Sequence, residues 1–185
     1  MSIDNGMESH GPQRSVILAV DDDEDDIELM RRLFRKAGVI RPVEVFREGE
    51  ELIAALTALM GKSDQSAIPL LCFLDVKMPS INGHEVLRWI RDQPQLDRLA
   101  VVMLSSSEHP EDVKQAAEGG AQCYLAKYPR ADVLKSVLDE AERVSKSGAA
   151  VCKEWFGVTA NLLLRWGLTG FRARQGSSEG LFHQP

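Results

Sequence analysis

Four groups of polar side chains stand in this sequence where an apolar run ends, and their types suit one chemistry. The groups are, in chain order, the acids of residues 21–26, Asp75, the serines of residues 105–107, and Lys127. Carboxylate oxygens are good ligands for a hard divalent cation such as Mg²⁺. A cation, an ammonium and a hydroxyl can neutralise phosphoryl oxygens while a carboxylate attacks phosphorus. Brought together, these groups would suit phosphoryl transfer.

Three of the carboxylates, Asp21, Asp22 and Asp75, are the candidates for this site. Close carboxylates repel each other and cannot all stay ionised without a counterion, which here is a bound cation or the lysine. Asp75 is the candidate nucleophile, because it stands alone after the most apolar run and precedes a loop with room for a partner. Asp25 and Asp26 have a simpler interpretation as acids that stabilise the start of a helix.

The elements that must position these groups alternate along the chain. Short apolar runs predict strands, and apolar residues three and four apart predict helices between them. The expected strands are residues 15–20, 43–46, 70–74, 100–104 and 123–126, and a helix is expected after each. This alternation predicts an α/β fold with a five-stranded, doubly wound parallel sheet and helices on both faces. Ligands bind beyond the carboxyl ends of the strands in such sheets, so the four groups are expected at one edge.

Length and composition exclude several other classes of protein. The 185 residues include 22 Lys and Arg against 28 Asp and Glu, a net charge of −6, which argues against non-specific nucleic-acid binding. No apolar run approaches the ~20 residues that cross a bilayer, so no membrane span is expected. Three Cys without a C-x-x-C spacing argue against a disulfide framework and favour a reducing, cytoplasmic location.

The flanks of the alternating region differ from it. Residues 1–14 are polar and without period, which predicts a disordered N-terminal arm. Residues 147–185 form a C-terminal extension that is expected to be partly helical and then disordered. Its apolar residues at helical spacing are Trp155, Val158, Leu162 and Trp166. An exposed face of this kind needs a partner surface. The options are the domain itself, a membrane surface or a second copy, and we favour a homodimer.

Four segments of the chain match a known family. They are VILAVDDDEDD (16–26), LDVKMPSINGHEVL (74–87), VVMLSSS (101–107) and CYLAK (123–127). Over residues 15–146 the chain resembles the receiver domain of a two-component response regulator, in a single-domain, CheY-like form. The resemblance implies a flavodoxin-like strand order, 2-1-3-4-5. It also implies signalling by phosphorylation-controlled protein contacts rather than service as an enzyme.

The resemblance implies how a phosphoryl group would be accepted. Asp75 would take it from a phosphohistidine of a sensor histidine kinase, and slow hydrolysis would remove it. The implied ligands of Mg²⁺ are Asp21, Asp22, Asp75 and the backbone carbonyl of Lys77.

The remaining residues would carry the response. Ser105 would be the switch hydroxyl that binds the phosphoryl group, and Lys127 would pair with that group. Tyr124 would be the aromatic side chain that changes rotamer on phosphorylation. The side chains of Lys77 and Ser107 would modulate hydrolysis.

One position departs from the family pattern. Proline usually follows the lysine, whereas here Tyr128 follows Lys127 and Pro129 comes one residue later. Because a non-proline cis peptide costs ~2.5–4 kcal/mol, we expect a trans Lys127–Tyr128 peptide and a shifted loop. Regulators linked to phytochrome-type kinases share such a departure, a long segment like residues 51–69, and an aromatic C-terminal extension like that at Trp155.

Two other functions compete with the regulator. The first is a receiver-like scaffold that is never phosphorylated. The second is a phosphatase with an aspartyl nucleophile. Such phosphatases have a second acid two residues after the nucleophile, where this chain has Lys77, and a cap domain, which this chain lacks.

Overall fold

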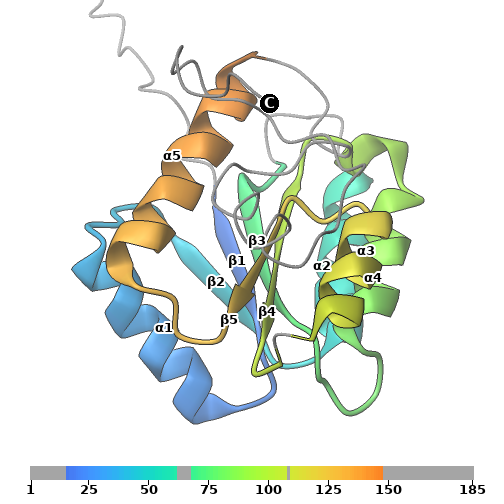
Figure 1. Cartoon of the computed structure of the whole chain (residues 1–185). Helices are drawn as coiled ribbons and strands as arrows, with labels where there is room; N and C mark the ends of the chain where they lie inside the picture. Colours follow the sequence, from blue (N-terminus) through green and yellow to red (C-terminus); the bar gives the residue numbers. More distant parts are fainter. Residues whose placement is uncertain (1–15, 62–67, 108, 148–185) are drawn as a thin grey trace, which may run out of the picture.

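The alternation of apolar runs folds into five parallel strands with a helix after each. The computed structural model describes residues 16–61, 68–107 and 109–147 (Figure 1). The elements are β1 (Ile17–Val20), α1 (Glu24–Lys36), β2 (Val43–Phe46), α2 (Gly49–Met60), β3 (Leu71–Asp75), α3 (Gly83–Arg91), the short 3-10 helix η2 (Pro94–Leu96), β4 (Ala100–Ser105), α4 (Pro110–Glu118), β5 (Cys123–Ala126) and α5 (Ala131–Ser147).

The strands form one parallel sheet in the order β2-β1-β3-β4-β5. This confirms the predicted fold class and strand order. β1 and β3 pair with Val20 opposite Leu74, and β3 and β4 pair with Asp75 opposite Leu104. The ends of these three central strands are therefore level, and the residues that follow them share one edge of the sheet.

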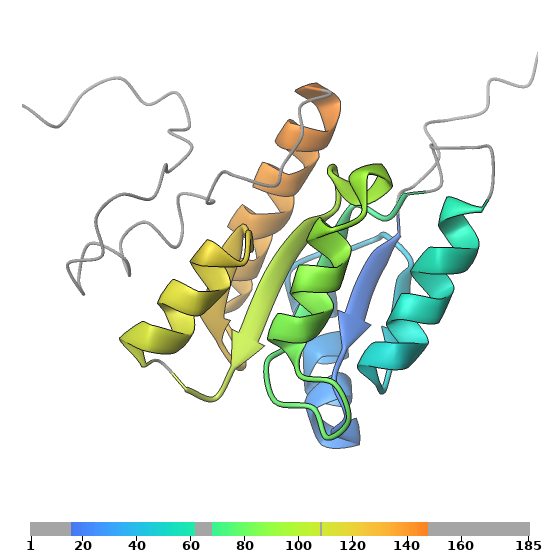
Figure 2. The same cartoon turned by 90° about the vertical axis from the view of Figure 1, so that its right-hand side faces the viewer.

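Helices cover both faces of the sheet. α1 and α5 lie on one face, and α2, α3 and α4 lie side by side on the other (Figures 1 and 2). The central strands β1, β3 and β4 are buried along their whole length, which explains their uninterrupted apolar runs. The core accordingly has two halves, one packed under α2, α3 and α4 and the other under α1 and α5.

The loop that follows β3 is held tightly against the end of that strand. Asn82 caps α3 by accepting a hydrogen bond from the Glu85 backbone N–H, while the Glu85 carboxylate accepts one from the Asn82 N–H. A Cβ at the next residue, Gly83, would lie 2.2 Å from the backbone oxygen of Asp75. Only glycine permits this close approach, so the start of α3 fixes the backbone at the end of β3.

The sequence predicted the five strands and a helix after each, and the expected limits of the strands agree with the structure to within two residues. The strands at residues 43–46 and 123–126 have the expected bounds. The third strand runs one residue further than expected and includes Asp75, and η2 was not expected. No helix among the described residues is long and apolar enough to cross a membrane. The N-terminal arm and the C-terminal extension lie outside the described residues, apart from Ser147.

Candidate functional site

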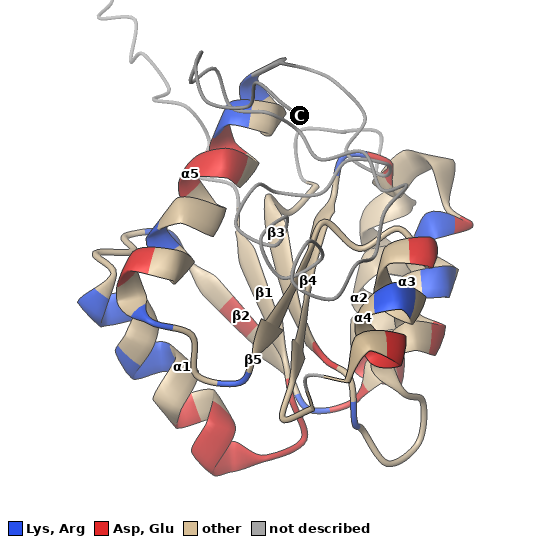
Figure 3. Cartoon of the chain, viewed as in Figure 1, with Lys and Arg blue, Asp and Glu red and all other residues tan. Residues whose placement is uncertain are grey.

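Three carboxylates gather at the carboxyl edge of the sheet. Asp21 and Asp22 directly follow β1, and Asp75 is the last residue of the neighbouring strand β3. One oxygen from each of the three lies within 4.8 Å of the others. Figure 3 shows acidic residues at this lower edge, where β1 leads into α1. The structure thus brings together the three acids that the sequence singled out.

Burial makes this group of carboxylates electrostatically unfavourable. Asp75 is 1% exposed and Asp21 is 5% exposed. By strict hydrogen-bond geometry neither oxygen of Asp75 has a partner among the described residues, although the Lys127 ammonium lies 3.2 Å from one of them. Desolvation, followed by the negative charge of Asp21, raises the pKa of Asp75 to about 6, and desolvation also raises the pKa of Asp21. Buried carboxylate oxygens that crowd together in this way fit a divalent cation, which would supply further positive charge.

Lys127 is the cation that the protein itself supplies to this group. Its Nζ atom lies 2.7 Å from Asp26, 3.1 Å from Asp21 and 3.2 Å from Asp75. Burial disfavours the charged ammonium, but the hydrogen bonds and charges of these carboxylates outweigh it and hold the pKa of Lys127 above its usual value. The side chain of Lys127 therefore stays protonated while it faces the carboxylates.

Asp26 has a role that sequence reasoning missed. As predicted, it lies in the acidic first turn of α1, whose N-cap is Asp23. However, one Asp26 oxygen accepts a hydrogen bond from Lys127 and the other accepts one from the hydroxyl of Tyr128. These two bonds outweigh partial burial and lower the pKa of Asp26. Asp26 stands four residues before the buried Met30, and this spacing indicates a side chain on the helix face that turns toward the sheet.

The hydroxyl and aromatic candidates lie at the ends of β4 and β5. Ser105 is fully buried, its backbone oxygen accepts a hydrogen bond from the Lys127 N–H, and its hydroxyl accepts one from the Ser107 N–H. The Ser107 hydroxyl donates to Asp112 in α4. Tyr124 is 1% exposed, and its hydroxyl donates to the backbone oxygen of Ser107. Tyr124 thus packs inward against the loop that starts at Ser105.

A groove of about 580 Å³ opens beside Asp22. It lies between the loop after β3 and the helix α4, and its walls include Lys77, Asn82, His84 and Asp112. The Lys77 side chain is exposed here. The contact of its carbonyl with a metal stays a prediction. Of the three clustered acids, Asp22 lines this groove.

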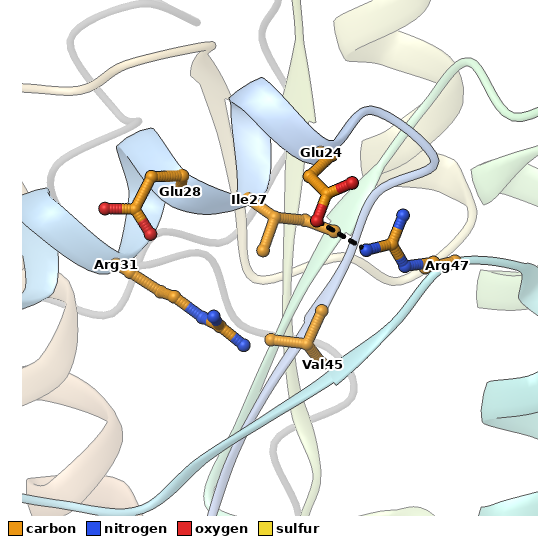
Figure 4. A pocket seen from close by; sticks show the side chains of 6 residues that line it. All are labelled: Glu24, Ile27, Glu28, Arg31, Val45 and Arg47. Atoms are coloured by element: carbon orange, nitrogen blue, oxygen red, sulfur yellow. Dashed lines mark ion pairs between the residues drawn. The ribbon is translucent and has the colours of Figure 1, made fainter.

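A second, smaller pocket lies on the other side of the start of α1. Figure 4 shows its floor of Ile27 and Val45 and its charged rim, in which Arg47 contacts Glu24 at 3.0 Å. Its lining includes none of the three clustered carboxylates. Lys127 does not line it either. This pocket is therefore separate from the candidate site.

Comparison with known proteins agrees with the geometry. The family model described as the response regulator receiver domain matches residues 17–139. The chain belongs to this family. It is therefore a receiver domain of the kind that two-component signalling systems use, which confirms the resemblance recognised in the sequence.

Two response regulators are among the proteins to which the chain is similar. The response regulator Rcp1 of Synechocystis is 33% identical over 120 residues, which cover 65% of this chain and 80% of Rcp1. A crystal structure of Rcp1 in its Mn²⁺-bound form has 29% identity and a TM-score of 0.52, covering 74% of this chain and 98% of that one. The phosphorylated cyanobacterial phytochrome response regulator RcpA has 28% identity and a TM-score of 0.57, covering 75% of this chain and 99% of that one.

Proposed function

We propose that this chain is a single-domain response regulator that accepts a phosphoryl group on Asp75 from a sensor histidine kinase. The observation that carries the proposal is the buried Asp75 carboxylate, whose oxygens lack normal hydrogen-bond partners beside two further acids and the Lys127 ammonium. Such a carboxylate can attack phosphorus, and the Lys127 ammonium beside it supplies positive charge for the phosphoryl oxygens.

The chemistry follows from the side chains at the edge of the sheet. An Asp75 oxygen forms the new bond to phosphorus, while the bond between phosphorus and the kinase histidine nitrogen breaks and leaves its electron pair on that nitrogen. Lys127 stays protonated and faces the added negative charge. The Ser105 hydroxyl, now an acceptor for the Ser107 N–H, would turn to donate to a phosphoryl oxygen.

The metal in this proposal is Mg²⁺. Asp21, Asp22 and Asp75, with the backbone carbonyl of Lys77, would hold it. When bound, the ion would neutralise phosphoryl oxygens and offset the repulsion among the carboxylates. A divalent cation fits here because Asp75 and Asp21 are buried and the described side chains offer them little positive charge besides Lys127.

The output of the proposed reaction is a change in protein contacts. Phosphorylation would add negative charge at Asp75 and draw Ser105 and Lys127 toward it. The Ser107 backbone oxygen would then shift away from the Tyr124 hydroxyl that it now binds. Because Ser107 also holds Asp112, α4 would move with this loop. We thus propose that a partner reads the surface around α4 and β5.

The kinase that we propose is of the phytochrome type, in the cytoplasm. The similarity to Rcp1 and to RcpA, which is described as a phytochrome response regulator, supports this choice. Tyr128 stands where proline is usual, as expected for this subgroup. Cys72 is a free thiol buried in the core, which suits a reducing compartment.

A mass measurement tests the proposal. The protein is mixed with Mg²⁺ and a small acyl phosphate such as acetyl phosphate, and its intact mass is followed. We expect a gain of one phosphoryl group that disappears in Asp75→Ala and is retained in the exposed neighbour variant Asp25→Ala.

Two results would contradict the proposal. No mass gain with an acyl phosphate or with a phosphorylated kinase would favour the scaffold. Sustained turnover of an aryl phosphate by the wild type would favour the phosphatase.

A further inference from the structure

The Lys127 ammonium has three carboxylate partners, and the closest one lies outside the candidate metal site. Its Nζ atom lies 2.7 Å from Asp26, against 3.1 Å for Asp21 and 3.2 Å for Asp75. A lysine ammonium has three N–H donors, so each donor can face one carboxylate. Asp26 is absent from the three-acid group that could hold a cation. It can therefore bind Lys127 whether or not a metal is present.

Asp26 also holds the residue that follows Lys127 in the chain. The Tyr128 hydroxyl donates a hydrogen bond of 2.5 Å to the second Asp26 oxygen. One carboxylate from the first turn of α1 thus binds two consecutive residues of the loop between β5 and α5. The partners are separated by 101 and 102 residues in the sequence, so the contact ties two distant segments together at the site.

The backbone at Tyr128 shows why the loop needs this tie. Its φ angle is +63°, a left-handed conformation that a bulky side chain disfavours. The Tyr128 side chain is exposed, so burial contributes little to holding it. The hydrogen bond to Asp26 gives the side chain a fixed position despite this exposure. The conformation of this loop determines where the Lys127 side chain projects. The hydrogen bond between Tyr128 and Asp26 therefore affects the position of the Lys127 ammonium.

We propose that Asp26, held by Tyr128, is the positioning residue that aims the Lys127 ammonium at the phosphoryl group. The inference rests on the function proposed above. As the bond from an Asp75 oxygen to phosphorus forms, the donor's bond to phosphorus breaks and its electron pair leaves with the donor group. Lys127 keeps its proton throughout. One of its N–H groups turns from the Asp75 carboxylate to a phosphoryl oxygen, while its other two N–H groups stay directed at Asp26 and Asp21.

The test compares rates of phosphorylation in the full chain. Wild type, Asp26→Ala, Tyr128→Phe and the control Asp25→Ala receive Mg²⁺ and acetyl phosphate, and intact mass gives the initial rate. Asp25→Ala removes the same charge from the same helix turn, but Asp25 is exposed and is not among the three carboxylates that contact Lys127. We expect Asp26→Ala to slow the reaction on the order of tenfold or more, since small displacements of a catalytic group have large effects. Tyr128→Phe should slow it several-fold, and Asp25→Ala should match the wild type.

A double-mutant comparison separates positioning from a loss of structure. If Asp26 acts through Lys127, Asp26→Ala should slow the wild type but leave the already slow Lys127→Ala variant unchanged. Tyr128→Phe removes one hydroxyl from an exposed ring and should leave the fold intact. It therefore tests the same inference if Asp26→Ala unfolds.

The inference is overturned if Tyr128→Phe and Asp26→Ala react at the wild-type rate, or if Asp26→Ala slows Lys127→Ala by the same factor as the wild type. A wild type that never gains a phosphoryl group would instead overturn the proposed function itself.

Discussion

At the scale of single residues, the site contains buried carboxylates whose negative charges disfavour each other. Asp75 is buried next to Asp21, and one lysine ammonium faces both of them. The pKa of Asp75 rises to about 6 because desolvation and then the Asp21 charge oppose its ionisation. A folded-state pKa above the unfolded value means that the folded protein binds the proton more tightly. That contribution to stability is complete below the unfolded pKa of about 4 and is lost as the pH rises through about 6.

Replacement of Asp75 by asparagine should therefore stabilise the metal-free protein at neutral pH. The amide keeps the shape of the side chain and removes the buried charge. From the shift in pKa we expect a gain on the order of 1–3 kcal/mol at pH 7.5. Urea unfolding in the presence of a chelator measures it.

The gain from Asp75→Asn should shrink as the pH falls toward 4, because the wild-type carboxyl group is then protonated as well. An equal difference in stability at pH 4 and pH 7.5 would show that the raised pKa is not its cause.

At the scale of elements, short loops after the strands hold the functional residues in place. The loop after β3 returns so closely that Gly83 donates its N–H to the Val76 oxygen at 3.0 Å. The loop after β5 has no such glycine and instead places Tyr128 at a positive φ angle beside Asp26. One loop is thus fixed by the lack of a side chain, and the other by a side-chain hydrogen bond that reaches another element.

Substitution of Gly83 by alanine should displace the backbone of Asp75, although Gly83 lies at the far end of the loop that follows it. The new Cβ would meet the Asp75 backbone oxygen at 2.2 Å, so strand or helix must move. We expect a loss of stability of about 1–3 kcal/mol, as for other overpacked positions, together with slower phosphorylation of Asp75.

Gly61→Ala provides the matched control in chemical denaturation. Its Cβ would have no neighbour nearer than 3.6 Å, so its stability should change by only a few tenths of a kcal/mol. Equal effects of the two substitutions would contradict the close-approach argument.

At the scale of the whole molecule, the parallel sheet gathers like charges at one edge while its two-sided core supplies the stability. Asp21 and Asp75 belong to adjacent strand ends, so the fold cannot separate them without breaking the register of β1 and β3. The repulsion is thus a built-in property of the native state. A divalent cation that binds only the folded protein would relieve it.

Addition of Mg²⁺ should raise the melting temperature of the wild type. At a concentration a hundred times the Kd, binding to the folded state alone contributes about 2.7 kcal/mol. Differential scanning calorimetry with and without chelator measures the shift.

The proposed ligand Asp22 is exposed, so its replacement by alanine leaves the core intact and gives a clean comparison. We expect Asp22→Ala to lose most of the shift. An equal rise in melting temperature for the wild type and Asp22→Ala would show that the cation binds elsewhere.

Association through residues 147–185 stays a prediction at this scale. The 20.5 kDa chain should then sediment with twice its mass, and a chain that ends at Ser147 should sediment as a monomer. A monomeric full chain over a wide range of concentration would contradict it.

The amino-acid sequence by itself determined the fold class, the strand order through its resemblance, and the convergence of Asp21, Asp22, Asp75, Ser105 and Lys127. These follow from local rules, because apolar periodicity defines the elements and parallel strands end at a common edge. Only the tertiary structure decided which carboxylates share the ammonium and how Tyr128 is held. The pairing of Asp26 with Lys127 and Tyr128 spans more than a hundred residues. It depends on the angle at which α1 leaves the sheet and on one backbone φ angle, and neither has a local pattern that would predict it.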